Sequence, residues 1–412
     1  MTRIELAEND RVGLVVALSQ DAAAVIAASR LVEVRPEPFE RWRIVPASNT
    51  IGAVSVGDYD VVVQPKADFA SLLFMLGYAR DPGFSPEEFD GAAHDDLWPF
   101  VGETLARLAN SALLQGVLQG YVTTDDALTV VRGRIRVTDQ MARHPGLLLP
   151  LEVRYDDYSA DIVENQILRS ALHRMSLVPR MPDALRRRLA HLSARLDGVR
   201  ILTAGAATPF WRSSRLNARY HPALHLAELV LQTTGLGTSA GGQPVASFVI
   251  NMATVFEDFL TIALRESFAR ISFGRTDGQF RTHLDENEAI DVRPDVVHVV
   301  DKASRAVLDA KYKLSDAEGG YPVSDMYQMH AYCTVLGLEC GYLVYAGSRA
   351  EGVRPVDHVV RNTAIRIVAW PLDVTVSPAD LLGQVNHLAA TALGASRPLS
   401  VLVSGEVRAH WG

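Results

Sequence analysis

The 412-residue sequence contains no apolar run long enough to span a membrane. A transmembrane helix needs about 20 consecutive apolar residues, whereas the apolar run at 12–18 is far shorter. Three acidic residues, Glu5, Glu8 and Asp10, precede that run, where a signal peptide would carry positive charge. We therefore expect a cytoplasmic protein without a membrane partner.

Cysteine is also scarce, with only Cys333 and Cys340. Neither has a second Cys or a His at the spacing of zinc ligands, so no zinc site is expected. A disulfide between the two stays an alternative, but two thiols in so long a chain fit a reducing compartment better. We expect both to be buried thiols.

Several catalytic motifs are missing from the sequence. Without a GxxxxGK(S/T) motif, the chain is not expected to hydrolyse nucleoside triphosphates through a P-loop. The GxSxG, HExxH and dinucleotide-binding GxGxxG motifs are absent from suitable settings as well. His221 and His225 lack an acidic partner at zincin spacing, so we interpret them as core or surface histidines.

The net charge of −8 argues against a protein that coats nucleic acid by itself, but basic residues are unevenly distributed. Residues 130–220 contain sixteen Arg, no Lys and eight Asp or Glu, which gives this middle region a charge of +8. Such a region is compatible with a surface that follows a phosphate backbone. It is equally compatible with solvated helical faces, for example around Arg186–Arg188.

The length predicts two or three domains, and the patterns predict a mixed α/β fold in three parts. Residues 1–125 are expected to form a β-rich domain, residues 126–240 a mostly helical basic region, and residues 241–412 an α/β domain. A hairpin turn is expected at Gly57–Asp58, and the glycine-rich stretch 235–243 is the best linker candidate. Apolar spacing predicts helices at 69–78, 98–120, 160–177, 183–197, 221–234, 247–270, 322–337 and 378–394, and strands include 127–137, 290–300, 306–313, 341–346 and 364–370.

The segment 291–313 carries the clearest chemical pattern. Two β-rich runs joined by the polar stretch 301–305 predict a hairpin, with Asp295 at the start of the first strand. Asp309 and Lys311 lie two residues apart on the second strand, so their side chains share one face. Two carboxylates offer the hard oxygen ligands that Mg²⁺ prefers, and a nearby ammonium group can stabilise developing negative charge. These groups suit phosphodiester hydrolysis.

The choice of lysine supports this interpretation. The chain uses 36 Arg but only four Lys, and Lys311 and Lys313 are two of them. A surface charge could as well be Arg in this sequence, whereas a compact ammonium donor cannot be replaced by a guanidinium group. Lys313 is interpreted as a phosphate contact or a solvated strand end.

The pattern Pro294–Asp295 followed by Asp309–Ala310–Lys311 resembles the PD-(D/E)xK nuclease superfamily. The resemblance implies a restriction-endonuclease-like domain in which Asp295, Asp309 and the Ala310 carbonyl hold Mg²⁺ and Lys311 assists water attack. It also implies an accessory acidic ligand, Glu257, on the preceding helix. Tyr327, Gln328 and Tyr332 on the following helix are similar to a Q-xxx-Y variant, in which Gln328 positions the lysine or water.

Structural alternatives remain open for each of these residues. Asp295 can be a turn residue after Pro294, and Asp309 with Lys311 can be an exposed ion pair. Glu257 can face solvent, and Gln328 can be a partly buried amide. Glu164 and Asn165 on the helix 160–177 are interpreted as structural, because such side chains often cap or support a neighbour.

Beyond this domain, the order of motifs resembles the McrC family, the nuclease subunits of McrBC modification-dependent restriction systems. The segments that carry the resemblance are Arg132–Gly133–Arg134–Ile135, Asp161–Ile162–Val163–Glu164–Asn165–Gln166–Ile167–Leu168, Val255–Phe256–Glu257–Asp258–Phe259, Arg293–Pro294–Asp295, Asp309–Ala310–Lys311–Tyr312–Lys313 and Asp325–Met326–Tyr327–Gln328–Met329.

The McrC resemblance implies a Mg²⁺-dependent endonuclease subunit of a type IV restriction complex. Its partners would be double-stranded DNA carrying 5-methylcytosine and an McrB-type AAA+ GTPase in a hexameric ring. The N-terminal part would contact this ring and stimulate its GTPase activity. Two alternatives remain: a catalytically idle subunit that activates a ring NTPase, and a stand-alone DNA repair nuclease.

Overall fold

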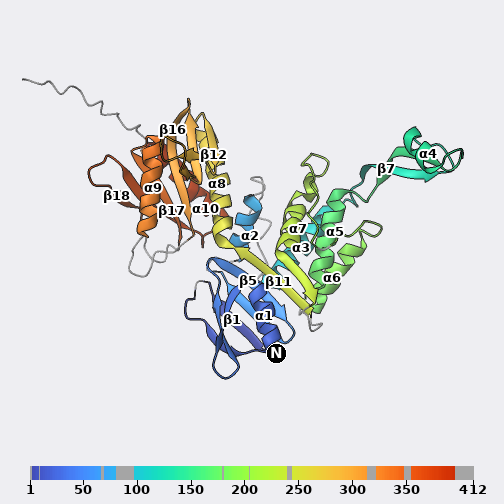
Figure 1. Ribbon diagram of the computed structural model, residues 1–412, viewed down its shortest axis with the longest axis horizontal. Helices are drawn as coiled ribbons and strands as arrows, with labels where there is room; N and C mark the ends of the chain where they lie inside the picture. Colours follow the sequence, from blue (N-terminus) through green and yellow to red (C-terminus); the bar gives the residue numbers. More distant parts are fainter. Residues whose placement is uncertain are drawn as a thin grey trace, which may run out of the picture.

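The computed structural model describes residues 2–8, 10–65, 69–79, 97–178, 181–203, 205–238, 244–312, 322–347 and 354–394. Figure 1 shows an N-terminal sheet, a helical layer with a projecting finger, and a C-terminal sheet flanked by helices. The predicted mixed α/β class is therefore confirmed, with several separate sheets. No helix in the described part of the chain is long and apolar enough to cross a membrane.

The N-terminal sheet combines strands from two distant parts of the sequence. Its strand order is β1 (Thr2–Ala7), β6 (Tyr59–Gln64), β5 (Thr50–Val56), β11 (Pro244–Asn251) and β10 (Thr234–Thr238). The predicted hairpin between β5 and β6 is confirmed. A small second sheet contains β2 (Leu14–Ala17), β4 (Arg41–Pro46) and β3 (Val32–Glu37). Helix α1 (Gln20–Ala28), which was not predicted, begins after Ser19, whose side chain accepts the Ala22 N–H.

Two predictions near residue 240 are wrong. Residues 235–238 are not a linker, because they belong to β10 and pair with β11, while residues 239–243 lie outside the described ones. The long helix does not begin at 247, because β11 pairs with β5 up to Asn251. Helix α8 (Met252–Ile271) then starts where the Asn251 side chain accepts the N–H groups of Ala253 and Thr254. The domain boundaries themselves stay a prediction.

The central part is a helical layer. It contains α3 (Leu97–Leu113), α5 (Val163–Ser176), α6 (Asp183–Ala194), the short η2 (Ala218–Tyr220) and α7 (His221–Thr233), which confirms the predicted helices. Helix α3 ends seven residues before the predicted 120. Helix α2 (Phe69–Tyr78), also predicted, packs against α8 on the side of the C-terminal part.

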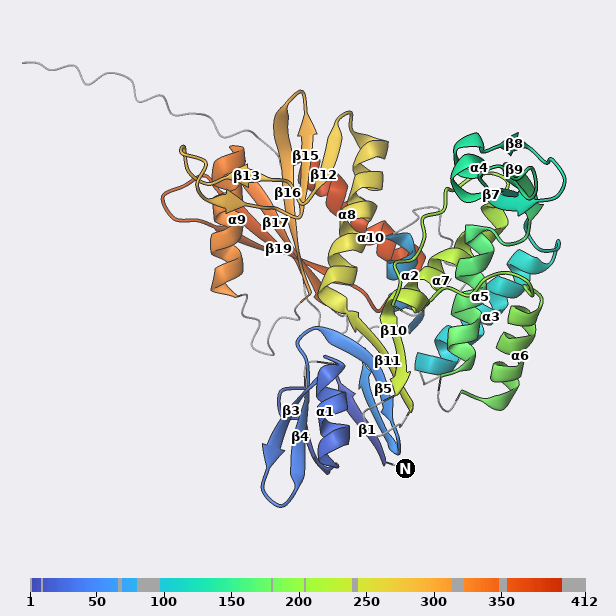
Figure 2. The same ribbon diagram turned by 45° about the vertical axis from the view of Figure 1, so that its right-hand side comes forward.

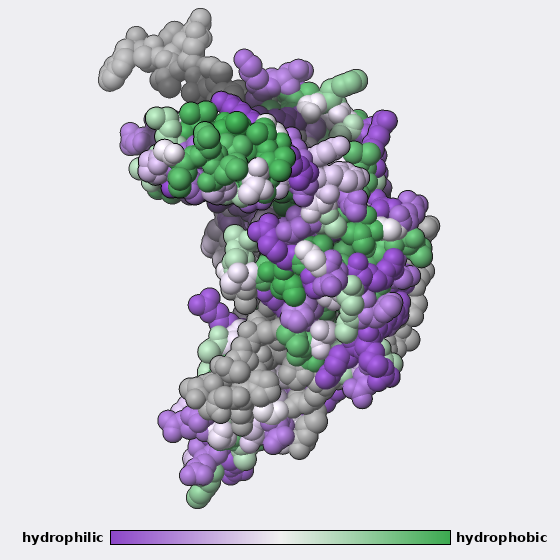
Figure 3. All heavy atoms as spheres, turned by 90° about the vertical axis from the view of Figure 1, so that its right-hand side faces the viewer, coloured by the Kyte–Doolittle hydropathy of each residue, from purple (hydrophilic) through white to green (hydrophobic). Residues whose placement is uncertain are grey.

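We call residues 120–159 the finger, because they project from the helical layer (Figure 1). The finger contains β7 (Gly120–Leu128), β8 (Arg134–Ile135), α4 (Val137–Arg143) and β9 (Leu151–Ser159), so the predicted strand 127–137 is only partly correct. Figure 3 shows apolar side chains gathered on its tip. Val137, Met141 and Leu148 there are exposed to 61%, 71% and 86%, and apolar patches of this kind often mark contact surfaces.

The C-terminal sheet has the order β12 (Arg275–Gly278), β15 (Val296–Val300), β16 (Ala303–Lys311), β17 (Cys340–Gly347), β19 (Arg366–Asp373) and β18 (Val356–Val359). Helices α8 and α10 (Pro378–Gly394) cover one face and α9 (Val323–Leu336) covers the other (Figure 2). A separate hairpin joins β13 (Thr282–His283) to β14 (Asp291–Val292). Cys333 and Cys340 are buried free thiols, as predicted.

Candidate active site

The predicted hairpin is formed by β15 and β16, which pair antiparallel from Val296–Leu308 to Val300–Ala303. Its turn is shorter than predicted, because only Asp301 and Lys302 lie outside the strands. Both have positive φ, 51° and 65°, which two-residue hairpin turns of type I′ require. Asp295 comes immediately before β15, so the hairpin brings it opposite the end of β16.

The alternation of side chains on β16 directs Asp309 and Lys311 toward the face covered by α9. Val307, on the same face, packs in the hydrophobic cluster of α9, whereas Ala306 and Leu308 pack on the opposite side of the sheet. The Lys311 Nζ lies 2.5 Å from Asp309 Oδ2, and their side chains are 15% and 2% exposed. Because Asp309 is buried and Lys311 is largely covered, the alternative of a solvent-exposed ion pair is excluded.

Asp295 is joined to β16 through the backbone. Its Oδ2 accepts the Ala310 N–H at 2.8 Å. Since the N–H and C=O of one strand residue point to the same side, the Ala310 carbonyl also faces Asp295. The structure thus brings together two carboxylates, one backbone carbonyl and one lysine, as the sequence pattern predicted.

Gln279, which the sequence did not single out, links Asp295 to Glu257 of α8. Its Nε2 donates to Asp295 Oδ1 at 2.9 Å and to Glu257 Oε1. Glu257 is partly buried and therefore does not simply face solvent. The amide group of Gln279 joins Glu257 to Asp295.

Burial and repulsion between carboxylates shape the electrostatics. Burial, together with the charges of Asp309 and Glu257, raises the pKa of Asp295 to about 8. Burial and the neighbouring Asp258 raise the pKa of Glu257. Burial alone would lower the pKa of Lys311. The ion pair with Asp309 outweighs this effect, so the pKa of the lysine is raised. Lys311 is therefore a cation at neutral pH.

Helix α9 supports the lysine from the other side. The Lys311 Nζ donates to Gln328 Oε1 at 2.9 Å, and Gln328 Nε2 donates to the Tyr332 hydroxyl at 2.6 Å. The Tyr332 hydroxyl in turn donates to the Arg293 carbonyl at 3.2 Å. Gln328 is exposed, which excludes the alternative of a partly buried amide, and Tyr327 is 72% exposed. Lys313 lies outside the described residues.

Comparison with known proteins places the chain in a family. Residues 45–346, more than half of the chain, match the family described as "McrBC 5-methylcytosine restriction system component". The chain belongs to this McrBC family. No curated protein matches the sequence.

Solved structures agree at the level of the fold. A chain in the refined half-complex from the tetradecameric assembly of Thermococcus gammatolerans McrB AAA+ hexamers with bound McrC has a TM-score of 0.62 and 16% identity. The match covers 95% of this chain and all of the other. A chain of the Thermococcus gammatolerans McrBC complex has a TM-score of 0.41 and 16% identity, over 65% of this chain and 88% of the other.

In this McrBC family member, Gly133 and Asn165, which belong to two motifs that precede the candidate site in the sequence, shape the finger. Gly133 has φ 69°, and an added Cβ would lie 2.3 Å from the Arg154 carbonyl oxygen, so only glycine fits. Asn165 is fully buried, and its Nδ2 donates to the carbonyls of Leu118 and Ala160, both at 2.7 Å. Its predicted structural role is to tie both roots of the finger to α5.

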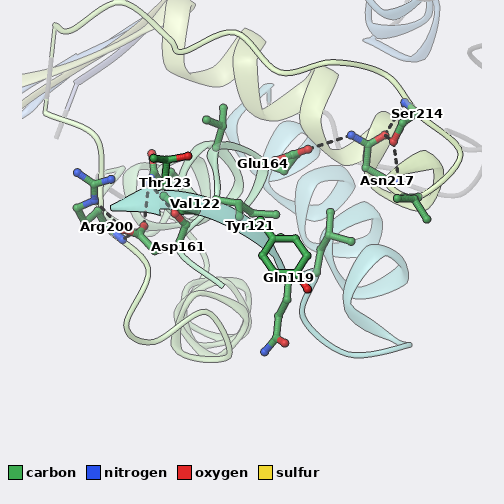
Figure 4. Close-up of a pocket in the computed structure, with 15 residues that line it drawn as sticks. Gln119, Tyr121, Val122, Thr123, Asp161, Glu164, Arg200, Ser214 and Asn217 are labelled. Carbon is green, nitrogen blue, oxygen red and sulfur yellow. Dashed lines mark hydrogen bonds and ion pairs between the residues drawn. The ribbon is translucent and has the colours of Figure 1, made fainter. Parts of the chain in front are cut away.

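A cavity of about 560 Å³ lies at the root of the finger, between β7, the start of α5 and residues 214–217. Figure 4 shows Asp161 bonded to Arg200 on one side and Glu164 bonded to Asn217 on the other. The cavity shares no residue with the hairpin site. We therefore place the candidate chemistry at the hairpin, where the charged groups converge.

The donor set at the hairpin suits one divalent cation. In the described ranges, no three imidazole, thiol or carboxylate groups converge as a ready-made metal cluster. Asp309 Oδ2 is buried and lies 2.5 Å from the Lys311 ammonium nitrogen. Together with Asp295, whose pKa is raised by burial and by the charges of Asp309 and Glu257, this oxygen gives the site the carboxylate donors that Mg²⁺ prefers.

Proposed function

We propose that the chain is the DNA-cleaving subunit of an McrBC-type restriction complex, a metal-dependent endonuclease that hydrolyses phosphodiester bonds. The observation that carries the proposal is the convergence of Asp295, Asp309 and Lys311 on one hairpin, with Ala310 N–H bound to Asp295 Oδ2 at 2.8 Å. Paired carboxylates and an ammonium group are the components that metal-assisted phosphodiester hydrolysis requires.

Asp295, Asp309 and the Ala310 carbonyl would hold Mg²⁺, which supplies Lewis acidity and lowers the pKa of a water molecule. Lys311 carries its charge at neutral pH, because Asp309 raises its pKa against the effect of burial. It therefore stabilises negative charge on the phosphate or orients the attacking water, rather than removing a proton. Gln328 fixes the Nζ position from α9.

We further propose that the partner is an AAA+ GTPase ring of McrB type, which this chain stimulates, and that the substrate is double-stranded DNA carrying 5-methylcytosine. The family description and the McrB hexamers in the similar structure support this. The exposed apolar tip of the finger supports a protein partner. A net charge of −8 agrees with recognition of DNA by another subunit.

The test is cleavage of methylated and unmethylated plasmid by the whole chain with Mg²⁺, with and without the partner ring and GTP. We expect cleavage of methylated plasmid only, and only with the partner. Asp309→Asn should reduce the rate at least about a hundredfold, the loss typical when a charge-stabilising group is removed. Asp301→Asn, at the exposed turn of the same hairpin, is the matched control and should cleave normally.

Two outcomes would contradict the proposal in different ways. If the chain stimulates the GTPase but never cuts, it is a regulatory subunit with an idle site. If it cuts linear DNA without any partner and regardless of methylation, it is a stand-alone repair nuclease.

A further inference from the structure

Gln279 follows β12 in a backbone conformation that is uncommon for a side chain with a Cβ. Its φ is 51°, in the left-handed region. The surroundings enforce this conformation, because its N–H donates to the Asp295 carbonyl at 2.8 Å and its own carbonyl accepts from Arg293 Nε at 3.4 Å. Strain of this kind persists where neighbouring groups fix it, often at functional sites.

The Gln279 side chain lies between two carboxylates. Its Nε2 donates to Asp295 Oδ1 at 2.9 Å and to Glu257 Oε1. The NH₂ end of the amide donates both hydrogen bonds, one to each acidic side chain. The amide oxygen, the end that could bind a cation, is therefore directed away from both.

Two-metal nucleases hold their ions about 3.5–4 Å apart, bridged by shared carboxylates. In this chain, the place for a second ion would be between Asp295 and Glu257, the two acidic groups beside the hairpin. The partial positive charge of the Gln279 NH₂ group occupies that place and satisfies one oxygen of each carboxylate. Glu257 Oε1 is thereby held in a hydrogen bond to Gln279.

We propose that Gln279 limits the active site to one divalent cation, bound by Asp295, Asp309 and the Ala310 carbonyl, and keeps Glu257 out of coordination. This inference rests on the proposed metal site. It replaces the accessory metal-ligand role that the superfamily resemblance implied for Glu257 with a role in holding Gln279.

The experiment counts Mn²⁺ ions on the whole chain by calorimetric titration and detects coupled Mn²⁺ pairs by electron paramagnetic resonance. We expect one ion per wild-type chain and no coupled pair. Gln279→Glu, of nearly the same shape, replaces the bridging NH₂ group by a carboxylate oxygen and should admit a second, coupled ion. Gln279→Met removes the NH₂ group that holds Glu257 and adds no ligand, so it should also admit a second ion, but with weaker affinity than Gln279→Glu.

Thermal unfolding of each variant checks that the fold is retained. Two ions on the wild-type chain, or a single ion on folded Gln279→Glu, would overturn the role of Gln279 and leave the nuclease proposal intact. Asp309→Asn, which lacks one proposed metal ligand, is the control that should bind no Mn²⁺. If the wild-type chain also binds none, the metal site itself is refuted, and the proposed function fails with it.

Discussion

Lys311 lies in a confined position between Asp309 Oδ2, at 2.5 Å, and Gln328 Oε1, at 2.9 Å. A guanidinium group is planar and larger than an ammonium group, so it cannot approach both oxygens in the same way. We expect Lys311→Arg to retain the charge yet lose at least about tenfold in cleavage rate, because the positive charge is displaced from the reacting phosphate. The plasmid assay measures this loss.

Lys302→Arg is the matched control, because Lys302 lies on the exposed turn of the same hairpin. Its cleavage rate should equal that of the wild type. If Lys311→Arg cleaves as fast as Lys302→Arg, then charge alone is sufficient, and the confined ammonium group has no special role.

The ionisation of Asp295 predicts how metal binding depends on pH. Its pKa of about 8 lies far above that of an ordinary aspartate, so without metal the folded chain favours the protonated form. The associated stability is present at acidic pH and is lost as pH rises toward 8. Mg²⁺ binds the ionised form, so its affinity should rise about tenfold per pH unit between pH 6 and 8 and then level off.

Calorimetric titration with Mg²⁺ at several pH values tests this dependence. Asp295→Asn, which has no carboxylate to titrate, should lose most of the slope along with most of the affinity. A wild-type affinity that stays constant from pH 6 to 8 would show that Asp295 is already ionised in the metal-free chain.

Sequence alone could place Asp309 and Lys311 on one strand face, because strand alternation is a local property. It could not reveal that Asp309 is only 1% exposed, since this burial depends on α9 and the neighbouring strands. Gln279 was missed for a related reason. It lies 16 residues before Asp295 and 22 after Glu257, and only the folded backbone brings its amide to both.

At the scale of elements, the root of the finger depends on a single amide. Asn165 at the start of α5 donates to the carbonyl before β7 and to the carbonyl after β9. We expect Asn165→Ala to lower the free energy of unfolding by about 1–3 kcal/mol, because two buried carbonyls lose their donor. Hydrogen exchange at Gly120 and Ser159 should become faster.

The matched control is Asn110→Ala, because Asn110 is exposed on the neighbouring α3. It should change stability by less than about 0.5 kcal/mol. If Asn165→Ala behaves like Asn110→Ala in chemical denaturation and in exchange, then other contacts fix the finger, such as that of Leu118 N–H with the Tyr220 hydroxyl.

Errors in predicting elements came from long-range pairing. Apolar residues lie on both sides of Asn251, so the spacing within 247–270 did not separate the end of β11 from the start of α8. The glycine-rich stretch at 235–238 has the composition of a linker, but its backbone pairs with β11. Strand β11 itself pairs with β5, whose residues lie 189 to 201 positions earlier in the sequence. Such pairings carry no local signal.

At the scale of the whole molecule, much of the positive charge in the middle region is neutralised locally. On the finger, Arg132 pairs with Asp157 at 2.7 Å and Arg154 pairs with Asp125 at 2.6 Å. Arg143 reaches Glu152 at 3.2 Å. These pairs favour the interpretation of the finger arginines as part of a solvated, internally paired surface rather than a continuous phosphate-binding surface.

The N-terminal and C-terminal parts share contacts that cross the predicted boundary at 240. Phe259 of α8 packs against Phe74 and Tyr78 of α2, with ring centroids 6.0 and 5.7 Å apart. The hydroxyl of Tyr312, the residue directly after β16, donates to Glu8 Oε2 at 3.1 Å in a buried position. A fragment beginning at residue 241 would lose these partners and would leave β11 as an unpaired edge strand.

We therefore expect the isolated fragment 241–412 to aggregate or to unfold without a cooperative transition, whereas the whole chain unfolds cooperatively. Tyr312→Phe in the whole chain tests one of these contacts alone, because it removes only the hydrogen bond to Glu8. It should lower the free energy of unfolding by about 1–3 kcal/mol. A fragment that melts cooperatively at the temperature of the whole chain would mean that the C-terminal sheet folds independently, and that these contacts position it without stabilising it.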